Sequence, residues 1–428
     1  KTNYAQIRLN FMEIFQQLGK QIEQSWRDKN YSEELFPSVA AHALRDFGLP
    51  EKVSAWDTVN WALGQDVLPE QRDLSGRFGD PPITLYNSPR FHIDIYFWLD
   101  GTTAIHQHAF CGAFQVIHGS SIHSSYEFET KEAINTFTEL GDINLDHCEL
   151  LKVGDVRKIL AGRQFIHALF HLDQPSATIV VRTHRSPLHL PQFEYRKPYL
   201  AVDPFFDEPN LTKKMQSLSM LYKAKHPDAD IRLGEMLEKA DFQSTFTILG
   251  NMRGFLRNNH IEQFFKVEQT ENRFDKMFEI VKKRHGKLAE MIPPIFAHYD
   301  KLQEFISRRS YVTNPEHRFF FALLLNVDGK ERILSLIKER FPETEAIEKI
   351  LDWTTELAQT KVMGMNVPNA LGVANFDDFD SFILEDMLKG VADEEIQKNL
   401  VEEMSNQILK KQPKTLPDGL RKLEIRQF

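Results

Sequence analysis

Residues 101–119 read GTTAIHQHAFCGAFQVIHG and place two histidines, His106 and His108, two positions apart in an apolar stretch. Because side chains alternate between the two faces of a β-strand, these imidazoles point to the same face. Two neutral imidazoles so placed can share one metal ion, and a third ligand from another strand would complete a site that keeps open positions. The stretch therefore predicts a strand that carries two metal ligands.

Residues 154–171 read GDVRKILAGRQFIHALFH and supply the third candidate ligand, His167. His171 lies four positions later in the same strand phase, so both side chains can face inward, and His171 could replace His167 or bind beside it. We assign the metal to His106, His108 and His167 and place His171 behind them, where it would orient a ligand or contact substrate. A metal-free barrel that keeps its histidines is the alternative.

These two stretches resemble the two conserved motifs of the cupin superfamily. The glycines that carry the resemblance are Gly101, Gly119 and Gly162. His167 falls at the ligand position of the second motif, whereas Gly112 falls where the first motif has a glutamate ligand. The resemblance implies a cupin-type antiparallel β-barrel, or jelly roll.

Without the glutamate, three neutral histidines surround the metal, which is similar to the cysteine dioxygenase branch of the cupins over about residues 85–190. That resemblance implies a mononuclear Fe(II) oxygenase that binds O₂ and a small molecule, either a thiol or an acidic metabolite; Zn, Ni and Mn are the alternative metals. The acid–base triad of that branch falls on Val181, Thr183 and Arg185, so it does not carry over. Its substrate-binding arginine corresponds at best to Arg90.

Further candidates lie around the motifs. His118 has an even number, like His106, so its side chain is expected on the same, inward face. It is a tentative catalytic residue together with His171 and Arg185, although an inward histidine is more often part of a core. Cys111 has an odd number, so its side chain is expected on the face opposite to His106, where it would be a small buried hydrophobe. Arg182 and Arg185 could bind an acidic substrate, or could simply pair with surface carboxylates.

The surrounding sequence predicts three parts. Helical spacing over residues 7–22, 38–47 and 53–63 predicts an N-terminal helical segment, residues 1–78, packed on the barrel. The barrel follows over residues 79–209, with short strands separated by turns at glycines that include Gly141. Residues 210–428 are expected to form an all-α domain with its own core, and a lid over the barrel mouth is the role that we favour for it. The chain is therefore an α+β multidomain protein.

Composition narrows the function classes. A net charge of −9, without a basic patch, argues against nucleic acid as a partner, and no apolar run is long enough to span a membrane. Two cysteines fit a reducing compartment, so we expect a cytoplasmic protein. A homo-oligomer is left open.

Three functions remain. The first is an oxygenase, in which substrate and O₂ bind one iron. The second is a metal-dependent isomerase or lyase, in which the ion acts as a Lewis acid. The third is a non-enzymatic module in which the barrel binds a small ligand and the helical domain contacts a partner, because fold alone does not determine function.

Overall fold

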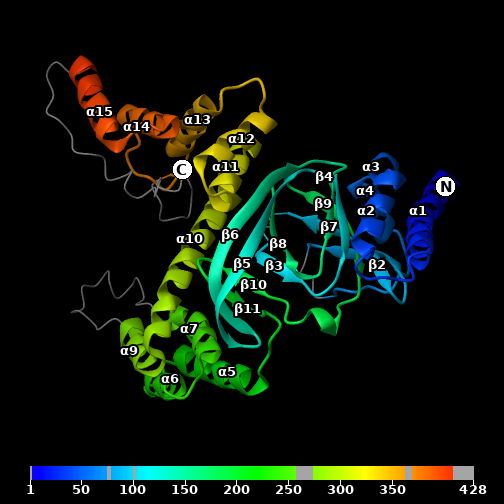
Figure 1. Ribbon diagram of the computed structural model, residues 1–428, viewed down its shortest axis with the longest axis horizontal. Coiled ribbons are helices and arrows are strands. Elements are labelled where there is room, and N and C mark those ends of the chain that lie inside the picture. The colour runs from blue at the N-terminus through cyan, green and yellow to red at the C-terminus, as the bar shows by residue number, and fades with distance from the viewer. Residues whose placement is uncertain (1, 75–78, 100–102, 257–272, 362–368, 408–428) are drawn as a thin grey trace. The chain divides into compact units, whose positions relative to one another are not determined.

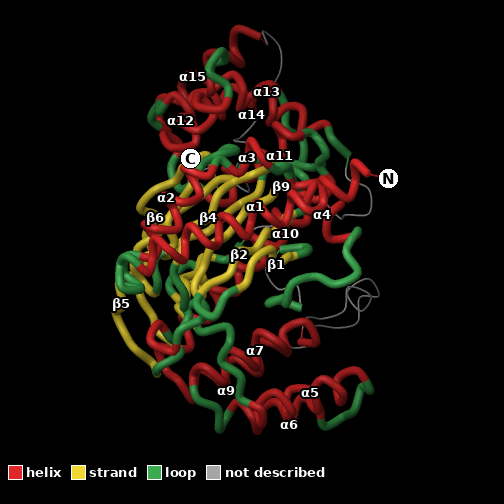
Figure 2. Tube along the Cα trace, turned by 90° about the vertical axis from the view of Figure 1, so that its right-hand side faces the viewer, coloured by secondary structure: helices red, strands yellow, loops and turns green. Residues whose placement is uncertain are grey.

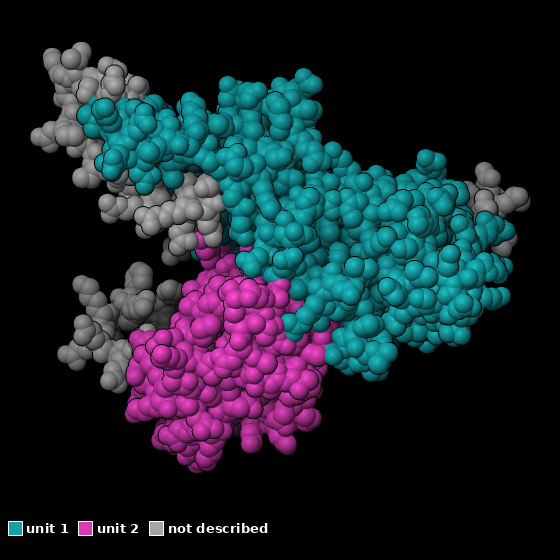
Figure 3. Space-filling model, in the orientation of Figure 1, with its two compact units in different colours: residues 1–127, 144–190, 302–428 teal, residues 128–143, 191–301 magenta. Residues whose placement is uncertain are grey.

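The computed structural model describes residues 2–74, 79–99, 103–256, 273–361 and 369–407. Gly101, which opens the first motif, lies outside the described residues. The chain divides into two compact units, coloured separately in Figure 3: unit 1 comprises residues 1–127, 144–190 and 302–428, and unit 2 comprises residues 128–143 and 191–301.

The expected N-terminal helices are present in unit 1. They are α1 (Thr2–Arg27), α2 (Phe36–Phe47), α3 (Leu49–Lys52) and α4 (Ala55–Leu63). Gly48 ends α2 in the left-handed conformation, and Ser54 caps α4 through a capping box with Asp57. The buried faces of α1 and α2 pack on a five-stranded sheet, as Figures 1 and 2 show.

That sheet has five antiparallel strands in the order β1-β2-β9-β4-β7. Their bounds are β1 (Pro82–Asn87), β2 (Phe91–Trp98), β9 (Ser176–Thr183), β4 (Gly112–His118) and β7 (Val156–Ile159). Alternation along β9 assigns its two faces. Ile179 and Val181 lie in the core with the N-terminal helices, whereas Val180 packs with Phe114 and Leu169 in the barrel interior.

The remaining strands form a closed barrel in the order β10-β11-β6-β5-β8-β3. Their bounds are β3 (Ile105–His108), β5 (Ser121–Asn135), β6 (Thr138–Leu151), β8 (Gly162–His171), β10 (Glu194–Arg196) and β11 (Leu200–Val202), and a 3₁₀ turn spans Pro187–His189. The expected α+β architecture with an antiparallel barrel is therefore present, while the jelly-roll connectivity stays a prediction.

The prediction of a turn at Gly141 is wrong, because this residue lies inside β6. A side chain at position 141 would overlap the carbonyl oxygen of Glu129 on the neighbouring strand. The glycine therefore serves a close approach of two backbones rather than a change of direction.

Unit 2 contains its own helical core. The helices are α5 (Pro209–Lys223), α6 (Ala229–Leu237), α7 (Phe242–Leu256) and α9 (Arg273–His285), followed by a 3₁₀ turn (Gly286–Met291) and the first half of α10 (Ile292–Tyr311). Leu233, Leu249 and Val281 are fully buried among them.

The last helices belong to unit 1. They are the end of α10, then α11 (Pro315–Asn326), α12 (Lys330–Arg340), α13 (Ala346–Gln359), α14 (Asp378–Lys389) and α15 (Asp393–Gln407). Asn314 caps α11 and Asp377 caps α14. Their core includes Ile122 and Phe170.

The helices beyond residue 209 thus contribute to two separate cores rather than one. Ile122 of β5 and Phe170 of β8 point to the strand face opposite to that of His123 and His167. The last helices, which pack on Ile122 and Phe170, therefore cover an outer face of the barrel wall and not its mouth. The physical reason is that these strands carry apolar residues on their outer face as well. The three-part division of the chain stays a prediction. Among the described helices, none combines the length and apolar composition needed to cross a bilayer.

Candidate metal centre

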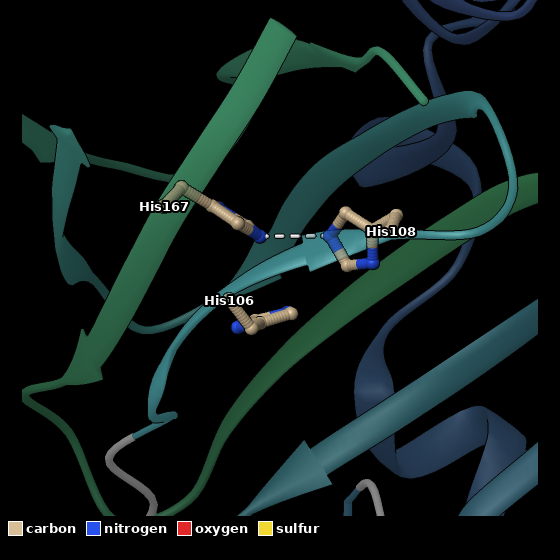
Figure 4. Close-up of side chains that lie close together, drawn as sticks. All are labelled: His106, His108 and His167. Atoms are coloured by element: carbon tan, nitrogen blue, oxygen red, sulfur yellow. Dashed lines mark hydrogen bonds between the residues drawn. The ribbon is translucent and has the colours of Figure 1, made fainter. Parts of the chain in front are cut away.

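The three predicted ligands lie together on two neighbouring antiparallel strands. His106 and His108 come from β3, His167 comes from β8, and His106 is paired with His167 in the strand register. One ring nitrogen from each of the three lies within 4.8 Å of the others, and Figure 4 shows the rings converging. His108 and His167 are buried, whereas His106 keeps part of its surface exposed.

One pair of ring nitrogens, which is hydrogen-bonded in this structure, lies at a distance that two ligands of one ion could also have. Nε2 of His108 and Nε2 of His167 are 2.9 Å apart, marked by the dashed line in Figure 4. Two imidazole nitrogens that each lie about 2.1 Å from one ion, at a right angle to each other, would be about 3.0 Å apart. This pair of nitrogens is therefore compatible with adjacent ligand positions at about 90° on one ion.

The hydrogen bond of His106 shows which of its ring nitrogens carries a proton. Its Nδ1 lies 2.7 Å from the carbonyl oxygen of Ala104, which can only accept, so Nδ1 carries the proton. The lone pair is then on Nε2. A neutral imidazole held in one tautomer is the form that binds a metal.

A chain of polar residues fixes His167 in the same way. Glu149 accepts from Nδ1 of His123 at 2.9 Å, and a neutral His123 ring then accepts at Nε2 from Nδ1 of His167 at 3.2 Å. His167 is left with its lone pair on Nε2, the atom that faces His108. Arg157 completes the chain, because both its Nε and its Nη2 donate to Glu149.

Electrostatics keep these groups in the required charge states. Burial, reinforced by neighbouring histidines that include His106, lowers the pKa of His108 and of His167 well below the ordinary value. Burial alone would raise the pKa of Glu149, but the hydrogen bonds from Arg157 and His123 lower it to about 2. At neutral pH His108 and His167 are therefore neutral and Glu149 is ionised.

Aromatic rings surround the cluster. The ring centre of Phe165 lies 4.3 Å from that of His167, and the ring centre of Phe110 lies 4.5 Å from that of His108. Phe114 is 6.4 Å from His167 by the same measure. These rings reduce the access of water to the buried side of the cluster.

The other predicted site residues lie elsewhere. His171 is buried on β8, with its ring stacked on Trp98 at 4.4 Å, and Nδ1 lies 2.9 Å from the hydroxyls of both Ser121 and Ser176. A register shift precedes His118, whose ring contacts Trp56 of α4 at 6.2 Å. Arg185 is exposed beyond the end of β9. The structure does not bring these three into the cluster, and their roles stay predictions.

Two residues of the first motif have clear structural roles. Cys111 is buried against the N-terminal helices, as its strand phase predicts, and burial raises the pKa of its thiol to about 12. Gly112 faces the neighbouring strand so closely that a Cβ would overlap the carbonyl oxygen of Val181. A ligand side chain at position 112 is therefore sterically excluded, and a glutamate there could not act as a fourth ligand.

The chain that orients His167 was missed by sequence reasoning. His123 on β5, Glu149 on β6 and His167 on β8 all have odd numbers, and their side chains point to the same, inner face of the strands. Alternation could have marked His123 as an inward histidine, but its pairing with Glu149 depends on a strand register that the sequence does not show.

No protein-family model matches this chain, and no curated protein matches it. Among solved structures, the chain is similar to one described as "Crystal structures of DMSP lyases RdDddP and RnDddQII", at 14% identity over 44% of this chain and 95% of that one, with a TM-score of 0.25. It is also similar to a recombinant oxalate oxidase in complex with glycolate, at 16% identity over 39% of this chain and 82% of the other, with a TM-score of 0.20. A second oxalate oxidase structure covers 44% of this chain and 81% of its own at 14% identity, with a TM-score of 0.21. At these TM-scores the similarities carry no argument about function, so the resemblance to cupins, and to their cysteine dioxygenase branch, rests on the two motifs.

Proposed function

We propose that His106, His108 and His167 hold one divalent metal ion, and that the chain is a mononuclear metal enzyme acting on a small molecule. The observation that carries the proposal is the convergence of three imidazoles, with two Nε2 atoms 2.9 Å apart. Two of the three rings are fixed in the tautomer that presents Nε2.

The reaction class that we propose is an Fe(II)-dependent oxygenation. A bound metal would bring a substrate and O₂ to adjacent positions, because three protein ligands leave further positions open. The residues of the chain then have separate tasks. His123 and Glu149 hold the ring of His167 in place, the aromatic rings exclude water, and the exposed edge of His106 gives access from solvent.

The test combines elemental analysis with oxygen uptake. Protein purified without chelators should contain about one iron per chain. The variants His106→Ala and His167→Ala should lose most of it, whereas His42→Ala, at an exposed histidine of α2, should keep it. Iron-loaded protein should consume O₂ with at least one member of a panel of small thiols and organic acids, and His167→Ala should not.

Two outcomes would overturn parts of the proposal. Equal metal content in the triad variants and in wild type would remove the three histidines as ligands. Stoichiometric Zn, Ni or Mn, with no uptake of O₂ by iron-loaded protein, would exclude the oxygenase and favour the Lewis-acid isomerase or lyase.

A further inference from the structure

Unit 2 contains a groove formed by helices α5, α6 and α7, which are labelled in Figure 1. Its volume is about 720 Å³, which lies in the range of small-molecule binding sites. All the residues that line the groove belong to unit 2, and none of the proposed metal ligands is among them. The proposed metal chemistry therefore does not account for this groove.

The floor of the groove is apolar. Leu211, Leu218 and Leu221 lie on one face of α5, because they are spaced by seven and three residues, and Met236 of α6 and Ile248 of α7 complete the floor. Leu218 and Ile248 are buried in the core of the unit, whereas the other three side chains are only half-buried. The half-buried side chains offer apolar surface, and a ligand that covered it would gain free energy.

The walls of the groove are basic. Three lysines line it, Lys213 and Lys214 from α5 and Lys239 from the end of α6. Among the described residues, none of the three forms an ion pair with a carboxylate, and Nζ of Lys213 donates only to the neutral amide of Gln216, at 3.0 Å. The charges of these lysines are therefore available to a ligand.

The two carboxylates of the groove are already engaged. Glu235 pairs with Arg232 at 2.9 Å. Glu208 caps the first turn of α5, where it accepts hydrogen bonds from the backbone N–H groups of Asn210 and Leu211. Neither carboxylate neutralises a lysine, so the groove combines an apolar floor with excess positive charge.

We propose that this groove binds a fatty-acid carboxylate, with the hydrocarbon chain on the apolar floor and the carboxylate at the lysines. The proposal goes beyond the metal enzyme proposed above and does not depend on it. The floor would supply most of the affinity, and the lysines would select an anionic head group. An acidic peptide helix would meet the same charges, but the volume of the groove fits a small molecule better.

The experiment is calorimetric titration of the full-length protein with dodecanoate below its micelle concentration. Wild type should bind about one dodecanoate per chain. It should bind octanoate more weakly, by up to about fourfold for each methylene removed, because each methylene covers part of the floor. Dodecyltrimethylammonium, which has the same chain and a cationic head, should bind at least about tenfold more weakly than dodecanoate.

Two variants test the groove itself. The double variant Lys214→Gln/Lys239→Gln should bind dodecanoate about tenfold more weakly, the loss expected for two exposed ion pairs, and should prefer it less over the cationic probe. Ser217→Phe places a ring in the groove from an exposed position of α5 and should abolish binding. If Ser217→Phe does not fold, the double variant decides.

The matched control is Lys223→Gln/Lys283→Gln, which removes two exposed lysines of unit 2 that do not line the groove. It should bind dodecanoate as wild type does. Absence of dodecanoate binding to wild type, or equal affinity in wild type and in the Lys214→Gln/Lys239→Gln variant, would overturn the proposal. An acidic amphipathic peptide that binds through Lys214 and Lys239, when dodecanoate does not, would also overturn it. The proposed metal site would stand after any of these results.

Discussion

At the scale of single residues, Gly112 shows how a sequence motif can be present while its chemistry is changed. The strand pairing leaves no volume at position 112, since a Cβ would overlap the carbonyl oxygen of Val181. Gly112→Ala should therefore lower the free energy of unfolding by about 1–3 kcal/mol, the usual cost of overpacking a tight site. Denaturant unfolding measures this.

The matched control for that substitution is Gly254→Ala in α7. A Cβ at position 254 meets no atom within 4 Å, and alanine is the better helix former, so stability should stay equal or rise slightly. A Gly112→Ala protein as stable as wild type would mean that β4 and β9 can move apart without cost, and that the empty volume is not required.

His171 should make the free energy of unfolding depend on pH. Burial, reinforced by Arg309, lowers the pKa of its ring to about 3, whereas in the unfolded chain it is about 6.5. Between these values the unfolded state binds a proton that the folded state does not. Stability is therefore fully present above about pH 6.5 and is lost progressively as the pH falls towards 3.

The prediction is a smaller acid sensitivity when His171 is replaced. In His171→Gln, the slope of unfolding free energy against pH between about 6 and 4 should decrease by up to about 1.4 kcal/mol per pH unit, the value for one proton. His42→Gln should leave the slope unchanged. If His171→Gln has the wild-type slope, His171 is not the buried neutral group that the structure describes.

At the scale of secondary-structure elements, four strands each contribute one member of the chain behind His167. His123 comes from β5, Glu149 from β6, Arg157 from β7 and His167 from β8. Glu149→Gln can no longer fix the tautomer of His123 by charge, so metal affinity should fall about tenfold to a hundredfold, the usual effect of losing such support. Competition with a chromophoric chelator measures the affinity.

The control for that variant is Glu127→Gln, an exposed position of the same hairpin. It should bind metal as wild type does. Unchanged affinity in Glu149→Gln would show that the His167 ring is held by packing alone.

The elements also show what the sequence could and could not reveal. The strand with His106 and His108 and the helix expected at residues 38–47 depend on local patterns, and both are present. The His123–Glu149 pair depends on strand register, which is set by distant residues. Gly141 was assigned to a turn because glycine is common in turns, although it serves a close approach here.

At the scale of the whole molecule, the last helices share a core with the barrel wall that carries His167. Phe170 and Ile122 on the strands pack with residues such as Phe319 and Trp353 on the helices. A chain truncated after residue 301 would expose this apolar surface, so it should aggregate or lose most of its metal affinity. A soluble truncated chain that binds metal as tightly as the full chain would contradict the shared core.

Sequence patterns located these helices but not their division between two cores. Helical periodicity identifies a buried face, yet it does not say what covers that face. The outer phase of β5 and β8 is apolar, at Ile122 and Phe170, and this was the available sign that a further layer packs outside the barrel.

The central claim is that one metal ion binds at His106, His108 and His167. The most direct test is a crystal of metal-loaded protein measured with X-rays on either side of the absorption edge of the bound metal. Our account predicts a single anomalous peak in the barrel, about 2.1 Å from Nε2 of each of the three histidines. A peak bonded to other residues, or none in crystals of protein shown to contain stoichiometric metal, would contradict it.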